Sequence, residues 1–205
     1  MTLFKKLLLF ITLPLYALDQ WSKWWVVGHF SEPPAPVVGL PKFTGTMDAP
    51  YAVIEGWFNF TRVHNQGVAF GLGNGSDWAP VVFLCVPIIA MVGLRIFWKK
   101  GVFSNLLSKI AVALLLCGIF GNLTDRLLQG SHLSYMAGKP FWERLSAGYV
   151  VDFLSVKLPY YEKISPESGG WWPVFNVADS CICVAAVLLF LGGLREEKQK
   201  KAAAA

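Results

Sequence analysis

The sequence predicts an all-α membrane protein with four transmembrane helices, both termini in the cytoplasm, and some strand structure outside the membrane. Hydrophobic residues make up 55% of the 205 positions and charged residues only 15%, and the mean hydropathy is +0.48. This composition is too apolar for an ordinary soluble domain. Basic residues lie beside the ends of the apolar segments and form no patch interleaved with aromatic residues, so we expect no nucleic-acid partner.

Four apolar segments are long enough to cross about 30 Å of hydrocarbon. Within a single membrane domain (1–205) they cover approximately residues 7–27, 79–98, 103–123 and 173–194. The first is also compatible with a signal peptide, because Lys5 and Lys6 precede a short apolar run. However, ALDQ is a poor cleavage site and WSKWWVV completes the span, so we expect a retained helix. The AAAA run at 202–205 resembles a cloning remnant and is left out of the interpretation.

The distribution of basic residues predicts the orientation. Ten of the 18 Lys and Arg residues lie before the first span, around the connection between the second and third, or after the fourth. The positive-inside rule therefore places both termini in the cytoplasm and the long connections, about 28–78 and 124–172, outside. YAVIEGWFNFTRVHN (51–65) is rich in aromatic and β-branched residues with partial alternation, which predicts strands over the membrane surface.

Carboxylates gather near the outer ends of three spans. Asp19 lies near the end of the first, Asp125 lies at the end of the third, and Asp179 follows Pro173 by six positions. Because these spans alternate in direction, the three acids are expected at one depth, just beneath the outer surface. Ionisable groups inside a membrane are costly, so each is a functional hypothesis.

Each of these acids has polar or charged neighbours on its own helix face: Lys23 for Asp19, Asn122 and Arg126 for Asp125, and Asn176 for Asp179. A structural ion pair that joins helices explains Asp19–Lys23 and Asp125–Arg126 equally well. Asp179 is also compatible with an acid that the helix dipole favours. A further acid, Asp152 in GYVVDFLSV, is either a strand residue facing solvent or a carboxylate held against the membrane, and the pattern favours neither.

Two carboxylates brought together at low dielectric share a proton and can hold a water between them, one acting as general base and the other as general acid. This aspartic-protease arrangement needs no metal and no cofactor. The sequence has no HExxH zinc motif, and Ser22 and Ser180 have only immediate sequence neighbours as partners. The GLGNGSD stretch (71–77) lacks the strand-to-helix setting of a phosphate loop.

Two other residue types receive structural interpretations. His64, beside Asn65, is expected to be an interfacial hydrogen-bonding residue, because it lacks spaced metal-ligand partners. The four cysteines fall in apolar stretches and are interpreted as small packing residues: Cys85, Cys117, Cys181 and Cys183.

Five motifs carry a resemblance to a known family: DQWSK (19–23), NQGVAF (65–70), GIFGNLTDR (118–126), VVDF (150–153) and FNVAD (175–179). Their order and topological places resemble those of the lipoprotein signal peptidase (signal peptidase II) family. Each motif alone is weak, but five in order are a strong signal. The resemblance implies an intramembrane aspartyl endopeptidase of the bacterial inner membrane, with its active site near the periplasmic face. It would remove the signal peptide of prolipoproteins before a cysteine that carries diacylglycerol.

The resemblance also implies a small extracytoplasmic β-rich cradle, partners limited to prolipoproteins and membrane lipids, and a monomer. The family's catalytic pair maps to Asp152 and Asp179. The other matching positions are implied to contact substrate or support the pair: Asp19, Lys23, Asn65, Gly67, Ala69, Phe70, Gly121, Asn122, Asp125, Arg126, Asn176 and Ala178.

Two departures from the family pattern matter. Cys117 stands where the family has the first glycine of a pair, which we expect to alter helix packing only slightly. Asp152 follows Asp125 by 27 positions, much more than in the family, so a loop of about 127–147 is interpreted as inserted. This keeps Asp125 open as an alternative member of the pair.

Two other classes of function compete with a protease. A small proton-coupled transporter would use the same carboxylates as a relay, but a relay distributes acids across the membrane and the inner halves of the four predicted spans hold none. A structural membrane scaffold with buried ion pairs would tolerate loss of the Asp179 carboxylate.

Overall fold

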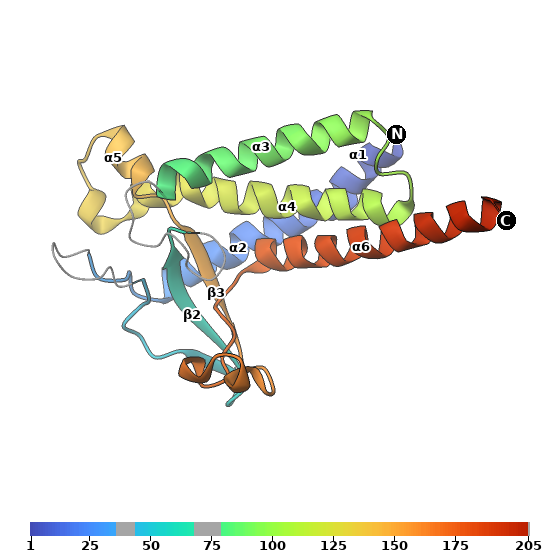
Figure 1. Ribbon diagram of the computed structural model, residues 1–205. Helices are drawn as coiled ribbons and strands as arrows, with labels where there is room; N and C mark the ends of the chain where they lie inside the picture. The colour runs from blue at the N-terminus through green and yellow to red at the C-terminus, as the bar shows by residue number, and fades with distance from the viewer. Residues whose placement is uncertain (36–43, 68–78, 205) are drawn as a thin grey trace. The chain divides into compact units, whose positions relative to one another are not determined.

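The computed structural model describes residues 1–35, 44–67 and 79–204, which belong to two compact units. The first unit comprises Met1–Gln20, Cys85–Asn122 and Val177–Ala205 and is built from helices. The second comprises Trp21–Leu84 and Leu123–Asn176 and contains the sheet (Figure 1). The chain is thus mostly helical with a small sheet, as predicted.

Long helices build the first unit and continue in part into the second. In chain order they are α1 (Leu3–Leu7), the single π-helical turn η1 (Leu8–Thr12), α2 (Leu13–His29), α3 (Ala79–Lys99), α4 (Leu106–Leu128) and α6 (Val177–Ala204). Both chain termini lie at the same end of the first unit (Figure 1). The side of a membrane on which they lie stays a prediction.

Small side chains pack α4 against α6. The buried cluster between them consists of Ala111, Leu114, Cys117, Cys181 and Ala185. A Cβ atom on Gly118 would lie only 2.7 Å from the carbonyl oxygen of Ala178, so this position tolerates only glycine. Small residues let helix backbones approach closely, which is how helices commonly associate in membranes.

The cysteines divide into two groups. Cys117 and Cys181 are buried in this cluster, which confirms their interpretation as small packing residues. The same expectation is wrong for Cys85 and Cys183, whose side chains are exposed on the outside of their helices. Apolar character alone does not say which face of a helix packs against the protein.

Helices occupy all four predicted spans, although their ends differ from the prediction. At the fourth, α6 begins at Val177 and not at 173, and it continues past 194 to Ala204. Phe175 pairs with Leu154 as an isolated β-bridge, so the residues before Val177 are held in an extended conformation. Asp179 consequently lies in the first turn of α6. By length and composition, two helices among the described residues could cross a membrane, Leu106–His132 and Val177–Lys198.

The sheet has three antiparallel strands, β1 (Tyr51–Ile54), β2 (Phe58–Asn65) and β3 (Val150–Val156), in the order β1-β2-β3. The strands predicted within 51–65 are therefore confirmed. β2 pairs with β3 from Phe58 opposite Val156 to Asn65 opposite Val150. Asp152 lies within this ladder and is buried, so it is a strand residue that does not face solvent.

The segment between α4 and β3 folds into short helical turns: η3 (Gln129–His132), η4 (Ser134–Met136) and α5 (Phe141–Ser146). Its two ends meet at a pair of glycines. A Cβ atom on Gly130 would lie 2.9 Å from the backbone nitrogen of Gly148, and one on Gly148 would overlap the carbonyl oxygen of Arg126. The two ends of this segment therefore lie close together. Two further turns, η5 (Tyr161–Lys163) and η6 (Pro166–Ser168), precede α6.

Candidate active site

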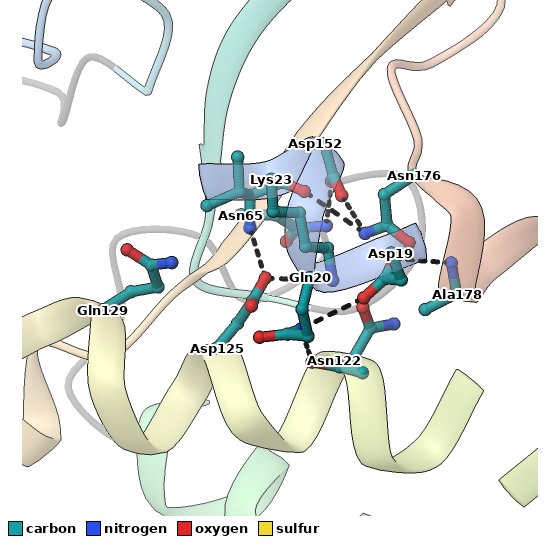
Figure 2. A network of polar contacts seen from close by, with 12 residues as sticks. Asp19, Gln20, Lys23, Asn65, Asn122, Asp125, Gln129, Asp152, Asn176 and Ala178 are labelled. Carbon is teal, nitrogen blue, oxygen red and sulfur yellow. Dashed lines mark hydrogen bonds and ion pairs between the residues drawn. The ribbon is translucent and has the colours of Figure 1, made fainter. Parts of the chain in front are cut away.

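Both carboxylate oxygens of Asp152 accept hydrogen bonds from side-chain amides in the second unit. Asn65 Nδ2 donates to Oδ2 over 2.9 Å, and Asn176 Nδ2 donates to Oδ1 over 2.7 Å (Figure 2). Asn65 ends β2, and Asn176 follows the residue that pairs with β3. The end of β2 and the residue after the Phe175 bridge therefore supply the two amides, and they fix the orientation of the carboxylate of Asp152, a residue that is only 2% exposed.

The Asn65 side chain is itself held by the backbone that follows β2. Its Oδ1 accepts a hydrogen bond of 3.0 Å from the backbone nitrogen of Gly67, which leaves its Nδ2 to donate to Asp152. Arg126, at the end of α4, donates to the carbonyl oxygens of Gln66 and Gly67. This arginine thus fixes the turn that orients the amide.

A buried ion pair lies beside the Asp152 strand. Lys23 Nζ is 3.0 Å from Asp125 Oδ2, and neither side chain is exposed. The same Asp125 oxygen accepts a hydrogen bond of 3.0 Å from the backbone nitrogen of Val151. Asp125 therefore fixes β3 one residue before Asp152, and its carboxylate is committed to an ion pair.

A second buried polar group stiffens the sheet next to Asn65. Arg62 donates through Nη1 to the carbonyl oxygens of Val27 (3.2 Å) and Phe30 (2.8 Å), at the end of α2, and through Nε to His64 Nε2 (3.0 Å). The His64 ring stacks on Tyr149 with 3.6 Å between centroids. Burial and the nearby Arg62 guanidinium lower the pKa of His64 to about 2, and burial raises the pKa of Tyr149 to about 12, so both rings are neutral.

Asp19 caps the start of α6 in the first unit. Its Oδ1 accepts a hydrogen bond of 2.8 Å from the backbone nitrogen of Ala178, one of the N-terminal groups that lack a partner within the helix (Figure 2). Gln20 donates from Nε2 to Asp19 Oδ2 and to the carbonyl oxygen of Gly121, both over 3.1 Å. A Cβ atom on Gly121 would lie 2.6 Å from Asp19 Oδ2, so glycine leaves room for this carboxylate.

Asp179 lies two residues into the same turn of α6. Its Oδ1 accepts a hydrogen bond of 2.8 Å from Asn122 Nδ2 of α4. The first unit therefore brings Asp19 of α2, Asn122 of α4 and Asp179 of α6 to one end of its bundle. Of the three acids predicted to lie at one depth, Asp19 and Asp179 belong to this unit, whereas Asp125 belongs to the second. Asp19 rather than Asp179 provides the helix cap.

Of the residues predicted for the site, Ala69 and Phe70 lie outside the described residues. The second unit brings together Lys23, Asn65, Gly67, Asp125, Arg126, Asp152 and Asn176. The first brings together Asp19, Gly121, Asn122, Ala178 and Asp179. Sequence reasoning missed Gln20 and Arg62. Arg62 left one signal in the sequence, since it is an arginine two positions before a histidine in an apolar strand.

The helical fold and its sets of buried carboxylates bound by amides define a membrane protein with groups suited to acid–base chemistry. A family model described as Signal peptidase (SPase) II, Peptidase_A8, matches residues 11–195. The chain therefore belongs to the signal peptidase II family and is a bacterial membrane protease.

Individual relatives agree with this assignment. A protein named lipoprotein signal peptidase from Syntrophus aciditrophicus (strain SB) is 30% identical over 186 residues, which cover 89% of each chain. One of the same name from Halalkalibacterium halodurans is 27% identical over 191 residues, covering 93% of this chain and 94% of that one. The solved structure of a bacterial membrane enzyme, determined in meso at 2.3 Å resolution, matches with a TM-score of 0.66 at 23% identity. It covers 94% of this chain and 90% of that chain, which supports the fold.

Proposed function

We propose that Asp152 and Asp179 form the catalytic pair of an intramembrane aspartyl endopeptidase. Its substrates are diacylglyceryl-modified bacterial prolipoproteins, and it cuts before the lipidated cysteine. Membership of the signal peptidase II family supports the removal of signal peptides from prolipoproteins as the activity of this chain. The assignment of the pair rests on the VVDF and FNVAD motifs and on the hydrogen-bond partners of the two aspartates.

In this mechanism a water bound between the two carboxyl groups attacks the scissile peptide carbonyl. The ionised aspartate takes a proton from the water as general base, and the protonated aspartate gives its proton to the carbonyl oxygen. The resulting tetrahedral diol then collapses with cleavage of the C–N bond: the aspartate that took the water proton gives it to the leaving nitrogen, and the other aspartate takes back a proton from a diol hydroxyl. Each aspartate regains a proton state from which another cycle can begin.

The hydrogen-bond and ion-pair partners of the aspartates support Asp152 and Asp179, and not Asp125, as the catalytic pair. Asp152 and Asp179 accept hydrogen bonds from the neutral amides of Asn65, Asn176 and Asn122. Asp125 is 3.0 Å from the Lys23 ammonium and would have to give up that ion pair to act as an acid or a base. We therefore assign Asp125 a positioning role and not a place in the pair.

We further propose four membrane spans, with both termini in the cytoplasm of an inner-membrane protein and the active site near the periplasmic face. Helices at all four predicted spans and the clustering of basic residues at one end of these spans support this arrangement. A lipid-modified substrate remains in the bilayer, so its cleavage requires reacting groups at membrane depth.

The test is a gel-shift assay in which the purified protein processes a diacylglyceryl-modified prolipoprotein. Asp152→Asn and Asp179→Asn should each abolish cleavage while thermal unfolding shows a folded protein. Asp48→Asn is the matched control because Asp48 is exposed, and it should retain full activity. Full activity in Asp152→Asn or Asp179→Asn would remove that residue from the pair, and Asp125→Asn would be tested next.

A further inference from the structure

The inserted segment exposes two large aromatic side chains next to each other on α5. Phe141 is 55% exposed and Trp142 is 74% exposed, and their rings meet edge to face with 5.1 Å between centroids. A soluble surface rarely leaves such a pair uncovered, whereas indole and phenyl rings are favoured at the boundary between lipid and water.

The position of α5 brings this pair to the end of an apolar helix. A Cβ atom on Gly130 would overlap the carbonyl oxygen of Arg144, so α5 packs directly against the last turn of the candidate span Leu106–His132. On that same end of the span, Leu127 and Leu128 are each nearly half exposed. The aromatic pair therefore continues an apolar surface that a membrane protein presents to lipid.

Other aromatic residues of the second unit lie near this end of the candidate span Leu106–His132. Trp24 of α2 meets His132 edge to face with 4.8 Å between ring centroids, and Trp21, one turn earlier on α2, is 67% exposed. Exposed tryptophans at the end of a span are the signature of the headgroup region.

We propose that residues 131–147 form an interfacial anchor that seats Phe141 and Trp142 in the headgroup region of a phospholipid bilayer. The short α5 cannot hold such a pair by itself, because isolated helices of one or two turns are unstable in water. Its closure at Gly130 and Gly148 fixes the anchor to α4, so that the anchor sets how deeply this end of α4 lies in the bilayer. This role is independent of the peptidase chemistry.

The test measures how deeply α5 lies in a lipid bilayer. The full-length protein is spin-labelled in nanodiscs of phosphatidylethanolamine and phosphatidylglycerol. Cys85→Ser and Cys183→Ser remove the exposed thiols. Leu145→Cys then introduces a reporter one turn from both Phe141 and Trp142, and Glu143→Cys introduces a reporter two positions away on the opposite side of α5. Collision rates with oxygen and with a water-soluble nickel chelate measure the exposure of each label to lipid and to water.

We expect the oxygen-to-nickel collision ratio to be severalfold higher at position 145 than at position 143. Phe141→Ser combined with Trp142→Ser should bring the two ratios together. Equal ratios in the parent, or a difference that survives loss of both aromatic residues, would overturn the anchor. Protection of position 145 from both reagents would also overturn it. Spin–spin broadening would then indicate a second copy, and protection that appears only with added prolipoprotein would indicate a peptide partner. Since no cleavage is measured, this outcome is separate from that of the catalytic proposal.

Discussion

Lys23 and Asp125 form an ion pair of 3.0 Å between two side chains that are both completely buried. Removing one member of such a pair leaves the other charge inside the protein without that counter-charge. We therefore expect Lys23→Met to lower the free energy of unfolding by about 3–5 kcal/mol. The double variant Lys23→Met/Asp125→Leu should recover most of the loss, because apolar residues of similar size often replace a buried pair without cost. Equilibrium unfolding in detergent micelles measures both.

The exposed pair Lys139–Glu143, at 3.8 Å, is the matched control. Lys139→Met should change stability by less than about 1 kcal/mol. Cleavage should stay low in the double variant even where stability recovers, because leucine cannot accept the hydrogen bond from Val151 that fixes β3. Recovery of activity together with stability would contradict the positioning role of Asp125.

Gly121 gives a second prediction, on the cap of α6. A Cβ atom there would lie 2.6 Å from Asp19 Oδ2 and 2.9 Å from Ala178 Cβ, so Gly121→Ala should displace the capping carboxylate. We expect a loss of about 1–3 kcal/mol in unfolding free energy, as for overpacking of a core, and a fall in the turnover number. Thermal unfolding and the gel-shift assay measure the two effects.

Gly93→Ala in α3 is the control, because no atom lies within 4 Å of its would-be Cβ. Alanine is the better helix former by about 0.5–1 kcal/mol, so this variant should be as stable as the parent or more stable. If Gly121→Ala behaved like Gly93→Ala, the close approach of Asp19 to α4 would not be needed.

The local sequence predicted the elements well because their patterns are local. Aromatic and β-branched residues at 51–65 indicated strands, and apolar runs indicated the four long helices. The environment of the Asp152 side chain was ambiguous, because the sequence pattern around a carboxylate in an apolar strand is the same whether the carboxylate faces water or buried amides. Only the pairing of β2 with β3 and the bridge at Phe175 put Asn65 and Asn176 beside it.

The partners of the charged residues could not be predicted from helical spacing. Lys23 lies one turn from Asp19 on α2, yet its ammonium forms an ion pair with Asp125 of α4. Arg62 was not singled out, since its role depends on the carbonyl groups at the end of α2, which are more than 30 positions away. Such contacts depend on tertiary packing and leave little trace in sequence spacing.

His64 predicts a pH dependence of stability. Its pKa is about 2 in the folded protein and near 6.5 when the ring is free in water. Between these values the unfolded chain binds a proton that the folded chain does not. This contribution is therefore fully present above pH 6.5 and is lost as the pH falls, by at most about 1.4 kcal/mol per pH unit.

His64→Gln should remove the contribution of His64 to the pH dependence of the unfolding free energy between pH 7 and pH 5. The glutamine amide oxygen can still accept the hydrogen bond from Arg62. Thermal unfolding of parent and variant across this range measures the difference. Identical slopes in the two proteins would mean that the His64 ring takes up its proton without unfolding of the sheet.

The glycine closure of the inserted segment gives the last prediction. Deleting residues 131–147 and joining Gly130 to Gly148 should leave a folded protein that cleaves prolipoprotein in the gel-shift assay. The expected reason is that the Gly130 Cβ position is already 2.9 Å from the Gly148 nitrogen, so β3 need hardly move. The deletion removes the buried Leu133 side chain, which should cost about 2 kcal/mol of unfolding free energy.

Gly130→Ala distinguishes this explanation from general tolerance of loop deletion. In the full-length chain its Cβ would overlap the carbonyl oxygen of Arg144, so the substitution should destabilise the protein. In the deleted chain Arg144 is absent, and the same alanine should be accommodated with little loss. An equal loss in both backgrounds would show that Gly130 is required for another reason, and that the inserted segment does not enter and leave through this contact.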